Sequence, residues 1–155
     1  MITISETDAV FQNSRTIGEA ANELKVSAST LRVYDACGLV VLPRDVRGYR
    51  WVSDKEMDRI RVIRSFIRDH KLNVKSVRIL SSHLPCWMVQ NCNARRQESC
   101  EYLLGRDEPC WQYHRDTGGC LDNECVDCDI YENAIDMISR LPEILRGNRL
   151  SDPAA

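Results

Sequence analysis

The stretch TIGEAANELKVSASTLRVYDACGLV, residues 16–40, determines the fold predicted for the first half of the chain. Its first part carries apolar residues at helical spacing, namely Ile17, Ala20, Ala21 and Leu24. The segment KVSAS interrupts that spacing, and Ser27 is a suitable N-cap for a second helix with Leu31 and Val33 in the core. Gly38 follows at the C′ position, where a left-handed residue commonly ends a helix. Two short helices joined by a tight turn are the skeleton of a helix-turn-helix, whose second helix enters the major groove of DNA.

Residues 42–57, LPRDVRGYRWVSDKEM, predict a small hairpin with Gly48 at its tip. The hairpin interleaves cations with aromatic side chains, namely Arg44, Arg47, Tyr49, Arg50 and Trp51. Fixed cations grip phosphate and planar groups pack on sugar, so this pattern is typical of a loop that holds a nucleic-acid backbone. With no acidic partner expected nearby, the arginines are the strongest candidates.

An amphipathic helix is predicted directly after this hairpin. Ser53 is a suitable N-cap with Glu56 at the N3 position. An apolar stripe follows at Met57, Ile60, Ile63 and Ile67. A further helix is expected around residues 74–80.

The motifs TIGE, VSASTLRVYD, GL and RGYRWVS occur in this order between residues 16 and 53, and together they resemble the DNA-binding domain of the MerR family of transcriptional regulators. The resemblance covers roughly residues 15–80. It implies a winged helix-turn-helix, a homodimer, and a palindromic promoter that is bent and untwisted for RNA polymerase. By position it also implies the DNA-facing residues: Ser29, Thr30, Arg32 and Tyr34 on the second helix, and Arg47, Tyr49 and Arg50 in the wing. Arg44, in the same basic loop, is a further DNA-binding candidate. Tyr34 has packing in the core as its alternative.

The chain departs from this family after residue 80. The family continues with a long dimerisation helix, whereas here Pro85 breaks the pattern. The remaining helical candidate is DIYENAIDMISRLPEILRG, residues 129–147, in which Pro142 is expected to end or kink the helix. How two chains would associate therefore stays open.

Composition and charge divide the chain into two modules. The 155 residues are 43% hydrophobic and 28% charged, an ordinary composition for a soluble globular protein. Residues 1–80 carry 14 Lys and Arg against 10 Asp and Glu, and residues 81–155 carry 7 against 13. A basic first half and an acidic second half indicate that only the first meets a polyanion. No apolar run is long enough for a bilayer, and no secretory signal is apparent, so we expect a cytoplasmic protein without a membrane partner.

Seven of the eight cysteines lie in the second half, at Cys86, Cys92, Cys100, Cys110, Cys120, Cys125 and Cys128. In a reducing compartment such a density favours metal or redox chemistry over disulfides. The segment also has little helical or strand periodicity and is too short to fold on a core of its own, so we expect it to need a staple. Cys37 stands apart from the others and is expected to be a small half-buried residue.

Three interpretations of these cysteines remain open. The spacing Cys120-x4-Cys125-x2-Cys128 is that of three iron–sulfur ligands in plant-type ferredoxins, with a fourth thiolate from upstream. Zinc is the alternative cofactor, although only Cys125 and Cys128 make a close pair. A thiol switch at that pair is the third, although the surrounding acidic residues disfavour a reactive thiolate. His83 and His114 are expected to face solvent.

The two Cys-Trp pairs in PCWMVQNC and PCWQY, followed by CVDCDIY, resemble a small sensor module of bacterial regulators and sensor kinases over residues 85–131. The predicted fold is mainly α. The predicted order is a tail (1–14), a winged helix-turn-helix (15–84), an irregular cysteine-rich metal- or cluster-binding domain (85–131), a short helix (132–147) and a tail (148–155). With no nucleophile–base pair and no phosphate loop, the sequence does not indicate an enzyme. It predicts a dimeric DNA-binding regulator that senses redox state, oxygen, nitric oxide or a metal through an iron–sulfur cluster.

Overall fold

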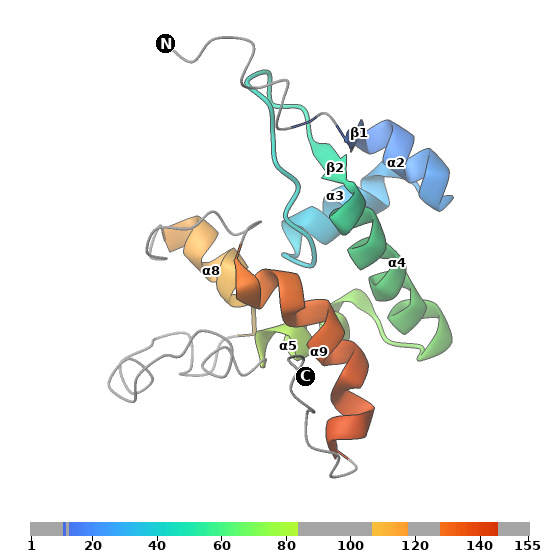
Figure 1. Cartoon of the computed structure of the whole chain (residues 1–155), viewed down its shortest axis with the longest axis vertical. Coiled ribbons are helices and arrows are strands. Elements are labelled where there is room, and N and C mark those ends of the chain that lie inside the picture. The colour runs from blue at the N-terminus through green and yellow to red at the C-terminus, as the bar shows by residue number, and fades with distance from the viewer. Residues whose placement is uncertain (1–10, 12, 84–106, 118–127, 146–155) are drawn as a thin grey trace, which may run out of the picture.

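The computed structural model describes residues 11, 13–83, 107–117 and 128–145 (Figure 1). In chain order the elements are β1 (Ser14–Thr16), α2 (Ile17–Leu24), α3 (Ala28–Ala36), β2 (Trp51–Ser53), α4 (Asp54–Asp69), α5 (Val74–Ser82), α8 (Cys110–Thr117) and α9 (Asp129–Leu145). This part of the chain is mainly helical, as predicted. Figure 1 places the two strands and α2 at one end of the molecule and the last turns of α9 at the other. No described helix is both long and apolar enough to cross a bilayer.

Local side-chain signals fix the ends of the first helices. Thr16 caps α2 in a reciprocal arrangement, since the Glu19 amide donates to its hydroxyl and the Thr16 amide donates to the Glu19 carboxylate. The predicted N-cap Ser27 is confirmed, because its hydroxyl accepts from the Thr30 amide at 3.0 Å. Gly38 has φ +71° directly after the C-cap of α3, which confirms its predicted C′ role.

The predicted hairpin is present between α3 and α4. Arg44 and Arg50 form an antiparallel bridge, and the Asp45 amide donates to the Tyr49 carbonyl at 3.0 Å. Gly48, at φ +84°, provides the left-handed residue near the tip. The strand β2 that follows begins at the end of this hairpin, where the Trp51 amide donates to the Pro43 carbonyl at 2.9 Å. β2 also pairs with β1 in antiparallel register, with Arg15 opposite Val52. β1 was not predicted from the sequence.

Ser53 caps α4 as expected, accepting from the Glu56 amide at 3.2 Å. Three of the four stripe residues are buried, and Ile67 packs against them partly buried. The helix predicted around residues 74–80 is α5. Together with α2 and α3, these helices enclose a core that includes Leu31, Leu39 and Val52.

The C-terminal helices join this same core. Trp111 from α8 and Tyr131, Ala134 and Ile138 from α9 are at most 2% exposed and belong to one cluster with the core of the first half. α9 contacts both α4 and α5 (Figure 1). The apolar surface of the first module is thus covered by the second, so the two modules of the sequence share one hydrophobic core.

One expectation for the second half needs correction, because the segment expected to be irregular contains a helix, α8, over Cys110–Thr117. The last helix begins at Asp129, where the helical pattern of residues 129–147 begins. It continues through Pro142 to Leu145, so of the two outcomes expected at Pro142 it does not end there. Burial of Trp111 and Tyr131 against the first half accounts for the order that the local pattern did not reveal.

Candidate nucleic-acid interface and its junction with the C-terminal helices

The exposed face of α3 carries Ser29 and Arg32, two of the residues predicted to face DNA. Val33 lies beside them and is 47% exposed, which corrects its expected place in the core. Tyr34 requires the opposite correction, because its side chain is 4% exposed and packs in the core rather than facing the groove. Leu31 is buried as predicted. Residues three apart share a helix face and residues two apart do not. Because Leu31 faces the core, Tyr34 faces it too, whereas Val33 faces outward.

Thr30 is half-buried at the start of this face. Its hydroxyl lies 2.9 Å from that of Ser27, which also receives the Thr30 amide. Thr30 therefore helps to form the N-terminal cap of α3. The first turn of the helix presents these small hydroxyl side chains next to the long Arg32.

The wing presents Arg44, Arg47 and Tyr49 to solvent, and Tyr49 is 64% exposed. Asp45 holds the loop from inside. Its carboxylate accepts from the amides of Arg47 and Tyr49, each at 2.9 Å, and from the Trp51 indole at 3.2 Å. Desolvation acts to raise the pKa of Asp45, but these hydrogen bonds outweigh it and lower the pKa. One ionised carboxylate thus sets the wing conformation and leaves Arg44 and Arg47 pointing outward.

Arg50 differs from the other wing arginines. Its Nε lies 2.8 Å from Oδ2 of Asp35, a carboxylate that is 5% exposed and also accepts from the Leu42 amide. The expectation that the wing arginines lack acidic partners is therefore wrong for Arg50. The Arg50 side chain, 22% exposed, ties the base of the wing to α3.

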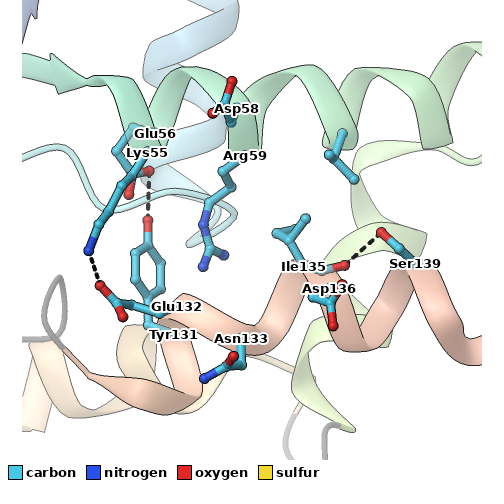
Figure 2. Close-up of a pocket in the computed structure, with 11 residues that line it drawn as sticks. Lys55, Glu56, Asp58, Arg59, Tyr131, Glu132, Asn133, Ile135, Asp136 and Ser139 are labelled. Carbon is cyan, nitrogen blue, oxygen red and sulfur yellow. Dashed lines mark hydrogen bonds and ion pairs between the residues drawn. The ribbon is translucent and has the colours of Figure 1, made fainter. Parts of the chain in front are cut away.

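A second junction joins the DNA-facing module, by which we mean residues 13–83, to α9. The Tyr131 hydroxyl donates to the Glu56 carboxylate at 2.7 Å (Figure 2). The same hydroxyl accepts from the Val41 amide at 2.7 Å. Burial raises the pKa of Glu56, and the nearby Arg59 charge and the Tyr131 hydrogen bond offset only part of that effect. Burial also raises the pKa of Tyr131 well above its usual value, which keeps its hydroxyl a donor.

Arg59 lies at the centre of this junction. Its guanidinium carbon is 3.6 Å from the centroid of the Tyr131 ring and 5.7 Å from that of Trp111. The two rings meet edge to face with centroids 5.2 Å apart. A cation and the aromatic ring that it lies over attract each other more strongly where water is excluded. This arrangement ties α4, α8 and α9 together.

α8 directly contacts the chain just after α3, the helix predicted to enter the DNA groove. The Trp111 indole donates to the carbonyl of Gly38. A Cβ placed on Gly38 would lie 2.9 Å from the Gln112 Cβ, so this close approach needs a glycine as well as its left-handed backbone. The segment between α3 and the wing is therefore contacted by α8 at Gly38 and by α9 at Val41.

Two of the seven candidate metal ligands can be placed. Cys110 is the first residue of α8, and Cys128 directly precedes α9, its carbonyl accepting from the Glu132 amide at 2.8 Å. Both are half-buried against the core, as is Cys37. Within the described ranges no three potential ligands come together as a metal site. The other candidates, Cys86, Cys92, Cys100, Cys120 and Cys125, lie outside the described residues.

The two histidines differ in what can be said of them. His83 is exposed at the end of α5, as expected, with its Nδ1 2.8 Å from the Ile79 carbonyl. The side chain of His114 lies outside the described part. Neither observation adds a ligand to the candidate set.

The junction residues Asp35, Glu56, Arg59, Trp111 and Tyr131 were not predicted as a site. Glu56 had a sufficient local role at the N3 position, and Trp111 and Tyr131 were noticed only as parts of a cysteine motif. A charged residue within an apolar stripe, as Glu56 and Arg59 are beside Met57 and Ile60, was the available signal.

Comparison with known families agrees with the geometry of the first half. Residues 15–84 match the family model described as MerR HTH family regulatory protein. No match was found among the curated proteins or among the solved structures. Regulators of this family are transcription factors and not enzymes, which agrees with the prediction from the sequence. Residues 15–84 are therefore a MerR HTH family regulatory domain.

Proposed function

We propose that this regulator binds a palindromic promoter as a homodimer, acts on RNA polymerase through the shape of that promoter, and responds to an iron–sulfur cluster held by its cysteine-rich segment. The observation that carries the proposal is the docking of α8 and α9 on the DNA-facing module. Both helices adjoin cysteines, and both contact the chain between α3 and the wing.

The exposed side chains suit DNA contacts of two kinds. Arg32 and Ser29 on α3 are placed to meet base edges and phosphates in the major groove. Arg44, Arg47 and Tyr49 on the wing are placed to hold the flanking backbone. Two copies would present two reading helices to the two half-sites of a palindrome.

The chemistry of the cysteines supports a thiolate-bound cofactor. Cys110 and Cys128 stand at the N-terminal ends of α8 and α9, where the helix dipole favours negative charge. Together with Cys120 and Cys125, and one or more of Cys86, Cys92 and Cys100, they would supply more thiolates than a cluster needs. A bound cluster supplies redox sensitivity. The chain itself positions Trp111 one residue after Cys110 and Tyr131 three residues after Cys128.

A change at the cysteines would reach the DNA-facing residues through these two aromatic side chains. Moving α8 withdraws the indole from the Gly38 carbonyl, and moving α9 withdraws the hydroxyl from Val41 and Glu56. A signal shifts an equilibrium only by its differential effect on the two states. Here that difference lies in whether α8 and α9 hold the segment between α3 and the wing.

The decisive experiment is to purify the full chain without oxygen and measure iron, acid-labile sulfide and zinc. Iron with equivalent sulfide and a visible charge-transfer band supports the cluster. Stoichiometric zinc without sulfide replaces it with a structural zinc site. A metal-free protein that cycles between dithiol and disulfide leaves the thiol switch.

Assembly is tested on the same preparation. Sedimentation should show a species near twice 17.8 kDa, because a palindrome requires two reading helices. A strictly monomeric, metal-loaded protein that binds single half-sites would contradict the dimer. A dimer that binds the promoter without changing its shape would contradict only the regulatory step.

A further inference from the structure

A pocket of about 510 Å³ lies between α4 and α9, at the junction that covers the DNA-facing module. Its lining combines an apolar part, formed by Val62, Ile135 and the Tyr131 ring, with a single buried cation, Arg59 (Figure 2). Pockets of this size hold metabolite-sized ligands, usually with apolar walls and a few placed polar groups.

Arg59 provides the polar group that such a ligand would need. Its side chain points from α4 toward α9 and is 6% exposed (Figure 2). Nη1 of its guanidinium is buried and has no hydrogen-bond partner. Buried donors are nearly always paired with an acceptor atom. The Tyr131 and Trp111 rings stabilise the charge of this guanidinium but supply no oxygen or nitrogen acceptor to Nη1. Nη1 can therefore still donate to an acceptor from outside the chain.

The charges around Arg59 narrow the choice of acceptor. The lining acids Asp58, Asp136 and Glu132 are already paired, with Arg61, Arg140 and Lys55 respectively. Glu56 receives the Tyr131 hydroxyl. Arg59 thus remains the one lining cation that no described carboxylate bridges. The acidic rim would repel a dianion such as phosphate, whereas one negative charge can be matched by Arg59.

We propose that this pocket binds a small monocarboxylate, whose carboxylate accepts a hydrogen bond from Arg59 Nη1 and whose apolar part packs on Val62 and Ile135. Carboxylates match the guanidinium geometry better than other monoanions do. The ligand would bridge α4 and α9 and so stabilise their packing. The site is inferred from the folded chain alone, so it stands whether or not a cluster occupies the cysteines.

The test is a chemical-shift titration of the full-length, ¹⁵N-labelled protein with benzoate as the probe. Saturable shifts are expected at the amides of Tyr131 and Ile135. Arg59→Lys keeps the charge but removes Nη1, and it should weaken binding at least about tenfold. Arg68→Gln is the matched control, because Arg68 is exposed on the same helix and, within the described residues, pairs only with Asp69. The benzoate affinity of this variant should stay within about twofold of the unmodified protein.

A second variant leaves Arg59 intact. Ser139 lines the pocket from α9, and Ser139→Phe should fill it and abolish the benzoate shifts while the remaining spectrum keeps its dispersion. Benzamide and benzylamine, with the same ring and no negative charge, should bind at least about tenfold more weakly than benzoate. Equal binding of benzamide, preference for benzylamine or phosphate, non-saturating shifts, or full affinity in Arg59→Lys would each overturn the site.

Discussion

Asp35 of α3 and Arg50 of the wing form an ion pair, with 2.8 Å between Oδ2 and Nε, across the base of the hairpin. The carboxylate is buried and also receives the Leu42 amide, so it holds the start and the end of the wing segment at one point. The angle between the reading helix and the wing is therefore set by a contact inside the domain.

Removing one partner of this pair should destabilise the fold. Arg50→Ala leaves the Asp35 carboxylate buried without its cation, and we expect a loss of about 3 kcal/mol in the free energy of unfolding, measured by urea denaturation. Arg47→Ala, at the exposed wing, should change stability by less than about 0.5 kcal/mol. The single variant Asp35→Asn and the double variant Asp35→Asn with Arg50→Ala complete the cycle, and the double variant should lose less than the sum of the two single losses. A loss equal to that sum would mean that the two side chains do not interact.

DNA binding should separate the arginines that face outward from the one that does not. Arg32→Ala should reduce operator affinity by about 1–3 kcal/mol, because a groove-facing Arg contributes that much. Arg47→Ala should weaken binding to any sequence and lower the dependence on salt by about one counterion. Gel-shift titrations at several salt concentrations measure both. If Arg32→Ala left operator affinity unchanged, the prediction that α3 lies in the groove would be wrong.

Glu56 should give the junction a pH dependence. Burial raises the pKa of Glu56 above its usual value near 4.5, so between those two values the folded chain holds a proton that the unfolded chain has released. Stability from this residue therefore falls as pH rises through that window, with Arg59, Lys55 and Tyr131 partly opposing the loss and Asp35 adding to it. Glu56→Gln removes the titration, so the melting temperature of the variant should rise relative to the unmodified protein as pH increases.

Glu19 is the matched control for this measurement. Hydrogen bonds from the Thr16 amide and hydroxyl lower the pKa of Glu19, so its contribution is present above its usual pKa and is lost on acidification. Glu19→Gln should thus fall behind the unmodified protein as pH rises, the opposite sign to Glu56→Gln. If the melting temperature of Glu56→Gln runs parallel to that of the unmodified protein across this pH range, while Glu19→Gln falls behind, Glu56 titrates as an exposed carboxyl.

The glycine between α3 and the wing should report on the docking of α8. Gly38→Ala and Gly48→Ala each place a Cβ on a left-handed residue, which costs roughly 1–2 kcal/mol. A Cβ on Gly48 meets nothing within 4 Å, whereas one on Gly38 lies 2.9 Å from the Gln112 Cβ. Only Gly38→Ala should therefore lose stability beyond the backbone term and expose Trp111 to acrylamide quenching. Equal losses at both glycines would place α8 away from Gly38.

Ligand cysteines should differ from the packing cysteine. Cys120→Ser, Cys125→Ser and Cys128→Ser should each abolish the cofactor measured by iron, sulfide or zinc content, because each removes one thiolate of the closely spaced set on which the site is expected to form. Each should also abolish the difference between aerobic and anaerobic reporter activity. Cys37→Ser should change neither. Full metal content in Cys125→Ser and Cys128→Ser would move the site to Cys86, Cys92, Cys100 and Cys110.

The helix ends and the wing were predictable because their signals are local. Ser27, Gly38 and Ser53 act within four residues of themselves, and the wing needs only its own turn and a strand beside it. The register of α3 was only half predicted. Leu31 and Val33 were both placed in the core, although a helix cannot bury residues two apart on one face.

The junction could not be predicted because its contacts span the chain. Tyr131 is 75 residues from Glu56, and Trp111 is 73 residues from Gly38. Neither distance leaves a period or a spacing in the sequence. Glu56 also had a complete local explanation, as the N3 residue three positions after the capping Ser53, and this concealed its role as a buried acceptor. The short length of the cysteine-rich segment predicts a staple but gives no sign that two of its aromatic side chains, Trp111 and Tyr131, pack in the core of the neighbouring module.

The shared core determines which pieces of this protein could be exchanged with those of another regulator. A chimaera joined at residue 84 would separate Tyr131 and Trp111 from the surface that buries them, so both halves would lose apolar contacts. A transplanted segment with α8 and α9 should dock only if the recipient carries a buried acceptor at the position of Glu56 and a glycine at that of Gly38. Those two residues therefore determine whether α8 and α9 can dock on the first module. Recombination between regulators should keep Glu56 and Gly38 together with α8 and α9.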